Sequence, residues 1–176
     1  MLTLRRLDLT GFRELLDQWT PLFNGDADLL YEHCRPHLEH AERICGEDPP
    51  DLQYGIYALI RHTDGTIVYE GFTHVNHKLP NSPDAEVRMV WNTLSPRYET
   101  ALTPEILADF TVAYISGAID LAKNSLPANA VRVYLGNATD RQYAQGIMAV
   151  MQSRTDVDVA FAGNWLHING VTTLEL

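Results

Sequence analysis

The chain has 176 residues, of which 45% are hydrophobic and 20% charged, and this is the size and apolar content of one compact globular domain. Its 23 acidic side chains outnumber 13 basic ones, and the formal charge of -10 argues against nucleic acid as the main ligand. We expect a single domain over residues 1–176, without a membrane span, a signal peptide or a disulfide scaffold. With only two cysteines and no CxxC pair, a reducing cytoplasm is the expected location.

The N-terminal part predicts a short strand followed by helices. Met1–Leu9 alternates weakly between apolar and polar residues, which suits an edge strand. Thr10 can cap a first helix, because apolar residues follow it at helical spacing. Asp26 or Asp28 can cap a second helical segment, which we expect to break or restart near Pro36.

Three strands are predicted in the centre of the chain, at Tyr54–His62, Thr66–Asn76 and Glu86–Leu94. The dipeptide Asp64-Gly65 separates the first two, and Asp-Gly between strand-like segments is typical of a tight hairpin turn with positive φ. The three strands should therefore form an antiparallel meander.

The C-terminal part predicts a long helix and further strands. Thr103 can cap a helix over Pro104–Lys123, with proline at its first position. The remaining predicted elements are a strand at Val131–Leu135, a helix at Thr139–Met151, a strand at Val157–Ile168 in which Gly163 can mark a bulge, and a last strand at Val171–Leu176.

This order of elements resembles the GNAT acetyltransferase superfamily over nearly the whole chain. Leu2–Leu7, LTLRRL, is similar to the opening strand of that family. Leu94–Pro104, LSPRYETALTP, falls where the family carries its coenzyme A pyrophosphate loop, and Leu94, Pro96 and Tyr98 match the loop pattern. Val131–Asn137, VRVYLGN, followed by a helix with Tyr143 and Gly146, resembles the fifth strand and fourth helix. The resemblance implies an α+β fold with a mixed, mostly antiparallel twisted sheet of six to seven strands and about four helices.

The resemblance also implies acetyl transfer from acetyl-CoA to an amine, a reaction that needs a base and an acid. Tyr143 is the candidate acid, although a half-buried packing tyrosine is the interpretation that we favour for this residue. The candidate bases are Glu70, which shares a strand face with His74, and Glu86, which shares one with Arg88. An alternative for these charged residues is a structural ion pair.

The pyrophosphate loop departs from the family pattern. Glu99 stands at the family's arginine position, and Thr100, Leu102 and Pro104 stand at its three small positions. Pro104 has no N–H and Leu102 adds bulk, so we expect coenzyme A to bind poorly or not at all by the usual contacts. The backbone that admits the pantetheine arm could persist, and Arg97 could supply a charge. The candidate cofactor-binding residues are Val90, Asn92, Leu94, Arg97, Thr100 and Thr103.

A metal site is not expected. His33, His37 and His40 would share one face of a continuous helix, beside Cys34, but Pro36 interrupts the register. The interspersed glutamates favour a solvated helix surface instead.

Two functions from different classes remain open at this point. The first is a GNAT-like N-acyltransferase acting on an amine. The second is a non-catalytic GNAT-fold binding or assembly protein, for example a phage or particle component, with a protein partner, a homodimer or a larger assembly. The loop without glycines at Thr100–Pro104 distinguishes them, because it bears directly on acyl-CoA binding.

Overall fold

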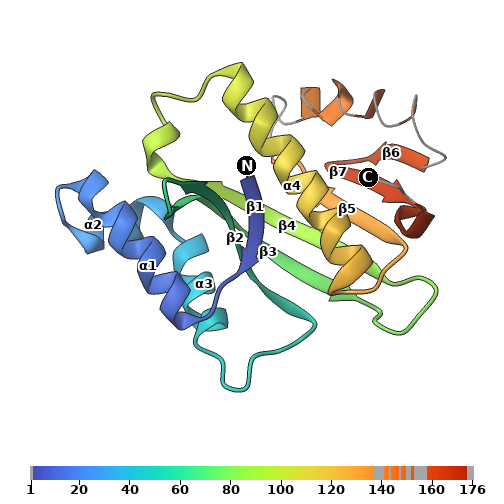
Figure 1. Ribbon diagram of the computed structural model, residues 1–176, viewed down its shortest axis with the longest axis horizontal. Helices are drawn as coiled ribbons and strands as arrows, with labels where there is room; N and C mark the ends of the chain where they lie inside the picture. Colours follow the sequence, from blue (N-terminus) through green and yellow to red (C-terminus); the bar gives the residue numbers. More distant parts are fainter. Residues whose placement is uncertain are drawn as a thin grey trace. The chain divides into compact units, whose positions relative to one another are not determined.

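The computed structural model describes residues 2–136, 141–142, 144–146, 148–149, 152 and 158–173 (Figure 1). Its seven strands follow the hydrogen-bonded order β1-β2-β3-β4-β5-β7-β6, which gives a mixed and mostly antiparallel sheet with helices in the connections. The predicted α+β fold class is confirmed. The chain divides into two units, Met1–His74 with Asn92–Leu102 and Val75–Trp91 with Thr103–Leu176.

The elements are bounded as follows. The strands are β1 (Leu2–Arg6), β2 (Tyr54–Thr63), β3 (Thr66–Lys78), β4 (Glu86–Leu94), β5 (Ala130–Tyr134), β6 (Asp158–Ala162) and β7 (Trp165–Asn169). The α-helices are α1 (Leu9–Trp19), α2 (Ala27–Cys34), α3 (His37–Cys45) and α4 (Pro104–Asn124). Short 3-10 helices lie at η1 (Thr20–Phe23), η2 (Pro96–Tyr98) and η3 (Val171–Thr173).

Two helices of the first unit, α1 and α2, are capped by aspartates. The Asp8 carboxylate accepts a hydrogen bond from the Gly11 N–H at 2.8 Å and caps α1, so the prediction of Thr10 as the cap was wrong. Asp8 is better suited because it precedes the helix with an extended backbone, whereas Thr10 already lies inside the first turn. Asp26 caps α2, and the predicted break at Pro36 is confirmed, because α2 and α3 are separate helices on either side of it.

The predicted central strands and their turn are confirmed. Asp64 and Gly65 have φ of 49° and 78°, so both turn residues adopt the left-handed conformation that a two-residue hairpin requires. The strands β2, β3 and β4 are consecutive neighbours in the sheet.

The core of the first unit is built around Trp19. This residue is fully buried, its indole N–H donates to the Tyr69 carbonyl oxygen at 3.0 Å, and its ring centroid lies 5.7 Å from that of Phe72. α1 contacts α3, and α3 contacts β2 (Figure 1). The indole therefore ties α1 to β3 through both packing and a satisfied polar atom.

The second unit contains α4 and the C-terminal strands. Thr103 caps α4 as predicted, and α4 contacts β5 (Figure 1). Phe110 and Ile115 of α4 and Val131 of β5 are buried in this unit. β5 pairs antiparallel with β7.

The end of the chain differs from the sequence prediction. The expected single strand Val157–Ile168 is a hairpin of β6 and β7, because Gly163 has φ of 60° and turns the chain instead of marking a bulge. The expected strand Val171–Leu176 is also wrong over its described part, since Val171–Thr173 is a 3-10 helix. The predicted helix Thr139–Met151 lies partly outside the described residues, and those that are described within it, 141–142, 144–146 and 148–149, are helical.

In the described part of the chain, no helix is both long and apolar enough to cross a membrane.

Candidate functional site

The most concentrated polar cluster of the first unit surrounds Glu70. Glu70 lies on β3 and is 2% exposed. One carboxylate oxygen accepts from Arg61 Nε at 2.7 Å, and the other accepts from the Tyr98 hydroxyl at 2.5 Å and lies 3.9 Å from Arg97 Nη1. A buried carboxylate requires such partners, because burying an unpaired charge is costly. Both oxygens of this candidate base are therefore engaged.

Tyr98 is the residue of this cluster whose role the sequence did not reveal. It lies in η2, which directly follows β4, and the Ser95 N–H donates to the Glu70 carbonyl oxygen at 2.8 Å. Burial, followed by the hydrogen bond to Glu70, raises the pKa of Tyr98 to about 12. The phenol is thus protonated at neutral pH and serves as a donor that fixes η2 on β3.

Arg97 also faces this cluster. Its Nε donates to Ser95 Oγ at 3.2 Å, and Nη1 approaches the Glu70 carboxylate. The sequence made Arg97 a candidate for binding a cofactor phosphate. In the structure its guanidinium instead contacts Ser95 and Glu70 of the first unit.

A pocket of about 400 Å³ lies beside the cluster in the first unit, between the α2–α3 junction and the end of β4; we call it the α2–β4 pocket. Two of the predicted cofactor-binding residues, Asn92 and Leu94, line it. Thr100 is exposed in the turn that follows η2 and is not among the residues that form the wall.

Two histidines join the sides of the α2–β4 pocket. His33 Nε2 on α2 contacts the Glu99 carboxylate, and His37 Nδ1 lies 2.6 Å from Thr93 Oγ1. Burial, followed by the charge of His40, lowers the pKa of His37, so this ring is neutral at pH 7. The third histidine of the pattern, His40, packs its ring 4.9 Å from that of His74.

The three histidines therefore have different neighbours instead of a common ligand. Among the described residues, no group of three or more His, Cys, Asp or Glu side chains is arranged to hold a metal ion.

The N-terminus of α4 is closed by the side chains of its own first turn. Thr103 Oγ1 accepts from the Ile106 N–H at 3.3 Å, and Pro104 at the first helical position has no N–H. The pKa of Glu105 is lowered because its carboxylate accepts its own backbone N–H, and then the hydroxyl of Thr103. Thr103 thus occupies one of the donors that a phosphate would need at this helix end, Pro104 lacks another, and Glu105 places a negative charge in the first turn.

Glu86, the other candidate base, lies in the second unit on β4. Arg88 Nε donates to one carboxylate oxygen at 2.8 Å, and Arg132 Nη2 lies 3.2 Å from the other. Burial acts to raise the pKa of Glu86, but the hydrogen bond from Arg88 and the charge of Arg132 outweigh it and lower the pKa. Glu86 is an ionised member of a two-arginine cluster.

The pairing of β4 with β5 is short. The two strands are parallel, with a register from Glu86 opposite Ala130 to Met89 opposite Val133. Val90, a predicted cofactor contact, lies one residue beyond this register. Tyr143, the candidate acid, lies outside the described residues.

The order of strands and helices is the one implied by the GNAT resemblance, with the second predicted helix divided into α2 and α3. The chain therefore has a GNAT-like fold.

The comparisons with known proteins concern structure only. The sequence matches no protein-family model and no curated protein. A structure described as AtaTR bound with AcCoA is 12% identical, with a TM-score of 0.49, over 96% of this chain and 93% of that one. An acetyltransferase from Thermus thermophilus is 12% identical, with a TM-score of 0.44, over 96% and 95% of the two chains. A GNAT-family acetyltransferase from Streptococcus pneumoniae is 11% identical, with a TM-score of 0.44, over 96% of each chain.

Proposed function

We propose that this chain is a GNAT-fold binding or assembly protein that does not hold coenzyme A through the phosphate contacts of the family. The closed N-terminus of α4 carries this proposal. An anion site at a helix N-terminus consists of free backbone N–H groups and a positive dipole end. Here Pro104 lacks the donor, Thr103 takes the Ile106 N–H, and the Glu105 carboxylate adds a negative charge to the first turn. The residues present do not fit a diphosphate at this position.

The state of the other loop residues supports the same conclusion. Glu99, at the family's arginine position, pairs with His33, and Arg97 is directed to Ser95 and Glu70. Glu99 has no positive charge, and the charge of Arg97 lies near the Glu70 carboxylate. A carboxylate in place of a guanidinium also repels an anionic ligand.

A GNAT-like N-acyltransferase is the second candidate. The short β4–β5 register, which ends at Met89, favours it because pantetheine insertion depends on strand geometry more than on side chains. In that function Glu70 or Glu86 would act as base and Tyr143 as acid. The engagement of both glutamates by arginines counts against either one as a base, since a base needs an accessible lone pair near the substrate.

The proposed partner is a protein, as a second copy of the chain or as another component of an assembly, and the whole of residues 1–176 acts as one GNAT-like domain. Leu22 of η1 and Leu29 of α2 are 46% and 48% exposed, and these neighbouring elements contact one another. The net charge of -10 favours a protein over nucleic acid, and the free cysteines Cys34 and Cys45 fit a reducing cytoplasm.

A loop-restoration variant tests the proposal. The substitutions Glu99→Arg, Leu102→Gly, Pro104→Gly and Glu105→Ala together reintroduce the family's charge and backbone donors. We expect acetyl-CoA to raise the melting temperature of this variant and to leave that of the wild type unchanged, with circular dichroism confirming that both are folded. Stabilisation of the wild type equal to that of the restored loop would contradict the proposal and favour the N-acyltransferase. Light scattering of the purified chain measures self-association directly.

A further inference from the structure

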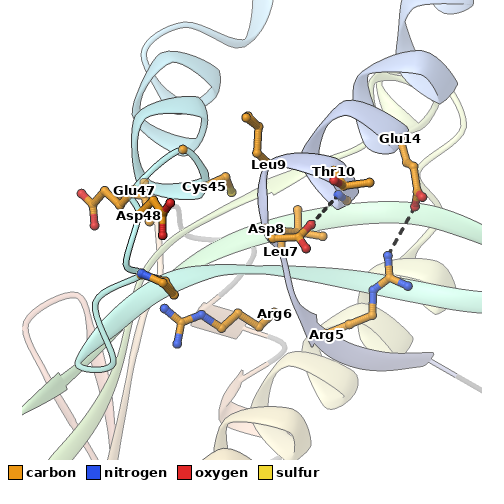
Figure 2. Close-up of a pocket in the computed structure, with 15 residues that line it drawn as sticks. Arg5, Arg6, Leu7, Asp8, Leu9, Thr10, Glu14, Cys45, Glu47 and Asp48 are labelled. Carbon is orange, nitrogen blue, oxygen red and sulfur yellow. Dashed lines mark hydrogen bonds and ion pairs between the residues drawn. The ribbon is translucent and has the colours of Figure 1, made fainter.

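A second cavity of the first unit, of about 820 Å³, lies between the end of β1, the start of α1 and the segment that follows α3 (Figure 2). We call it the α1–α3 cavity. Its walls carry charges of both signs, with Arg6 from β1, Asp8 before α1 and Asp48 after α3. Figure 2 shows the two aspartates on different sides of the opening, while Arg6 extends from its strand toward the same space.

Arg6 presents a positive charge that no carboxylate neutralises directly. Its Nη2 donates to two neutral acceptors, the carbonyl oxygens of Asp51 and Tyr54, the latter at 3.0 Å. Within the described part of the chain, no carboxylate oxygen lies within 4.0 Å of its guanidinium. A guanidinium has five N–H donors, so Nε and Nη1 retain donors for an anionic group.

Gly55 makes the space for this guanidinium. A Cβ at Gly55 would lie 3.0 Å from Arg6 Nε, so any side chain there would displace the arginine head. The glycine on β2 and the two carbonyl oxygens thus hold Arg6 in a defined position at the cavity wall.

The acidic residues of the cavity retain acceptors. Asp8 uses one carboxylate oxygen to cap α1 at Gly11, and both Asp8 and Asp48 are exposed. No hydrogen bond or ion pair engages the Asp48 carboxylate among the described residues. Burial, followed by the charge of Asp8, raises the pKa of the Cys45 thiol to about 12, while the charge of Arg6 acts to lower it.

We propose that the α1–α3 cavity binds a small zwitterion, an α-amino acid or a short peptide, with its carboxylate at Arg6 and its ammonium group at Asp8 and Asp48. A simple anion would be repelled by the carboxylates, and a simple cation by Arg6. A ligand that carries both charges meets a complementary partner at each end. Leu7, Leu9 and Ile44 also line the cavity, so an apolar side chain on the ligand can be desolvated there. This site is independent of the proposed function, because it uses neither η2 nor α4.

Four probes separate the charge requirements, and three of them, L-leucine, isoamylamine and 4-methylpentanoate, share a single isobutyl group. L-leucine and L-leucyl-L-leucine carry both charges, isoamylamine carries only the ammonium group, and 4-methylpentanoate carries only the carboxylate. We expect saturable chemical-shift changes at Arg6–Gly11 and Cys45–Asp48 with at least one of the two zwitterions, and at least tenfold weaker binding of both singly charged probes. Preference between the first two probes distinguishes a free amino acid from a peptide. Equal binding of either singly charged probe, or saturable binding of none of the four, would overturn the proposal.

Matched variants assign the two ends of the ligand. Arg6→Gln and Asp48→Asn should each weaken binding of the preferred zwitterion at least tenfold. Arg13→Gln and Asp17→Asn remove the same charges from exposed positions on α1 outside the cavity and should change affinity less than twofold. Asp48 is exposed and engages no described partner, so we expect Asp48→Asn to fold. This variant therefore tests the proposal even if Arg6→Gln does not fold. Full affinity in Asp48→Asn would overturn the assignment of the ammonium group.

Discussion

Replacement of Glu70 by glutamine tests whether this residue holds the fold together around η2. The substitution keeps the shape of the side chain and removes its charge. Arg61 and Arg97 then lose their anionic partner, and the Tyr98 hydroxyl loses a charged acceptor. Since Glu70 is nearly fully buried, water cannot replace these contacts at the carboxyl end.

The expected loss of unfolding free energy depends on how exposed Arg61 and Arg97, the partners of Glu70, are. Removing one member of a buried ion pair costs about 3–5 kcal/mol when the remaining charge is also buried. The side chains of Arg61 and Arg97 are 38% and 35% exposed, so water can partly solvate them once Glu70 is neutral. We therefore expect Glu70→Gln to lower the free energy of unfolding by about 2 kcal/mol, below the range for a fully buried pair.

Urea denaturation followed by circular dichroism measures this change. Glu39→Gln is the matched control, because Glu39 pairs with Arg35 at 3.0 Å while both side chains are more than half exposed. We expect the control to lose less than about 0.5 kcal/mol. Equal, small losses in the two variants would refute the anchoring role of Glu70.

Two further predictions concern the first unit. Burial, followed by the charges of His40 and Arg43, lowers the pKa of His74 to about 4, so the unfolded chain binds more protons than the folded one at mildly acidic pH. The contribution of His74 to stability should be complete above about pH 6.5 and should decrease as the pH falls toward about 4, by about 1 kcal/mol after allowance for partial exposure. His74→Gln should show a weaker loss over this range, and an unchanged pH profile would contradict the assignment. Gly65→Val should lower stability by about 1 kcal/mol or more, because Gly65 has φ of 78° although space around it is open. An unchanged urea midpoint in this variant would be incompatible with the turn.

Local sequence patterns predicted much of the fold because the determining residues are adjacent in the chain. Asp64-Gly65 specifies its own hairpin, and Thr103 with Pro104 specifies the start of α4. The prediction was wrong at Gly163, where the same residue type fits two different local structures. Gly163 is compatible with a bulge or a turn, and only the pairing of β6 with β7 distinguishes them.

The candidate site was less accessible to sequence reasoning because its contacts span long sequence separations. Glu70 meets Tyr98 across 28 residues, and His37 meets Thr93 across 56. No periodicity encodes such pairs, since they arise when the loop after β4 packs on β3 and when α3 packs at the end of β4. The position of Glu105 was accessible from the sequence, because an acidic residue in the first turn after a capping threonine is typical of a helix start.

Isothermal titration calorimetry of the wild-type chain with acetyl-CoA at physiological salt tests the central claim most directly. The closed N-terminus of α4 predicts no saturable heat up to millimolar acetyl-CoA, from a sample that circular dichroism shows to be folded. A micromolar dissociation constant that is weakened by Arg97→Ala would contradict it, because the diphosphate would then bind despite the capped Ile106 N–H, the missing N–H of Pro104 and the negative charge of Glu105.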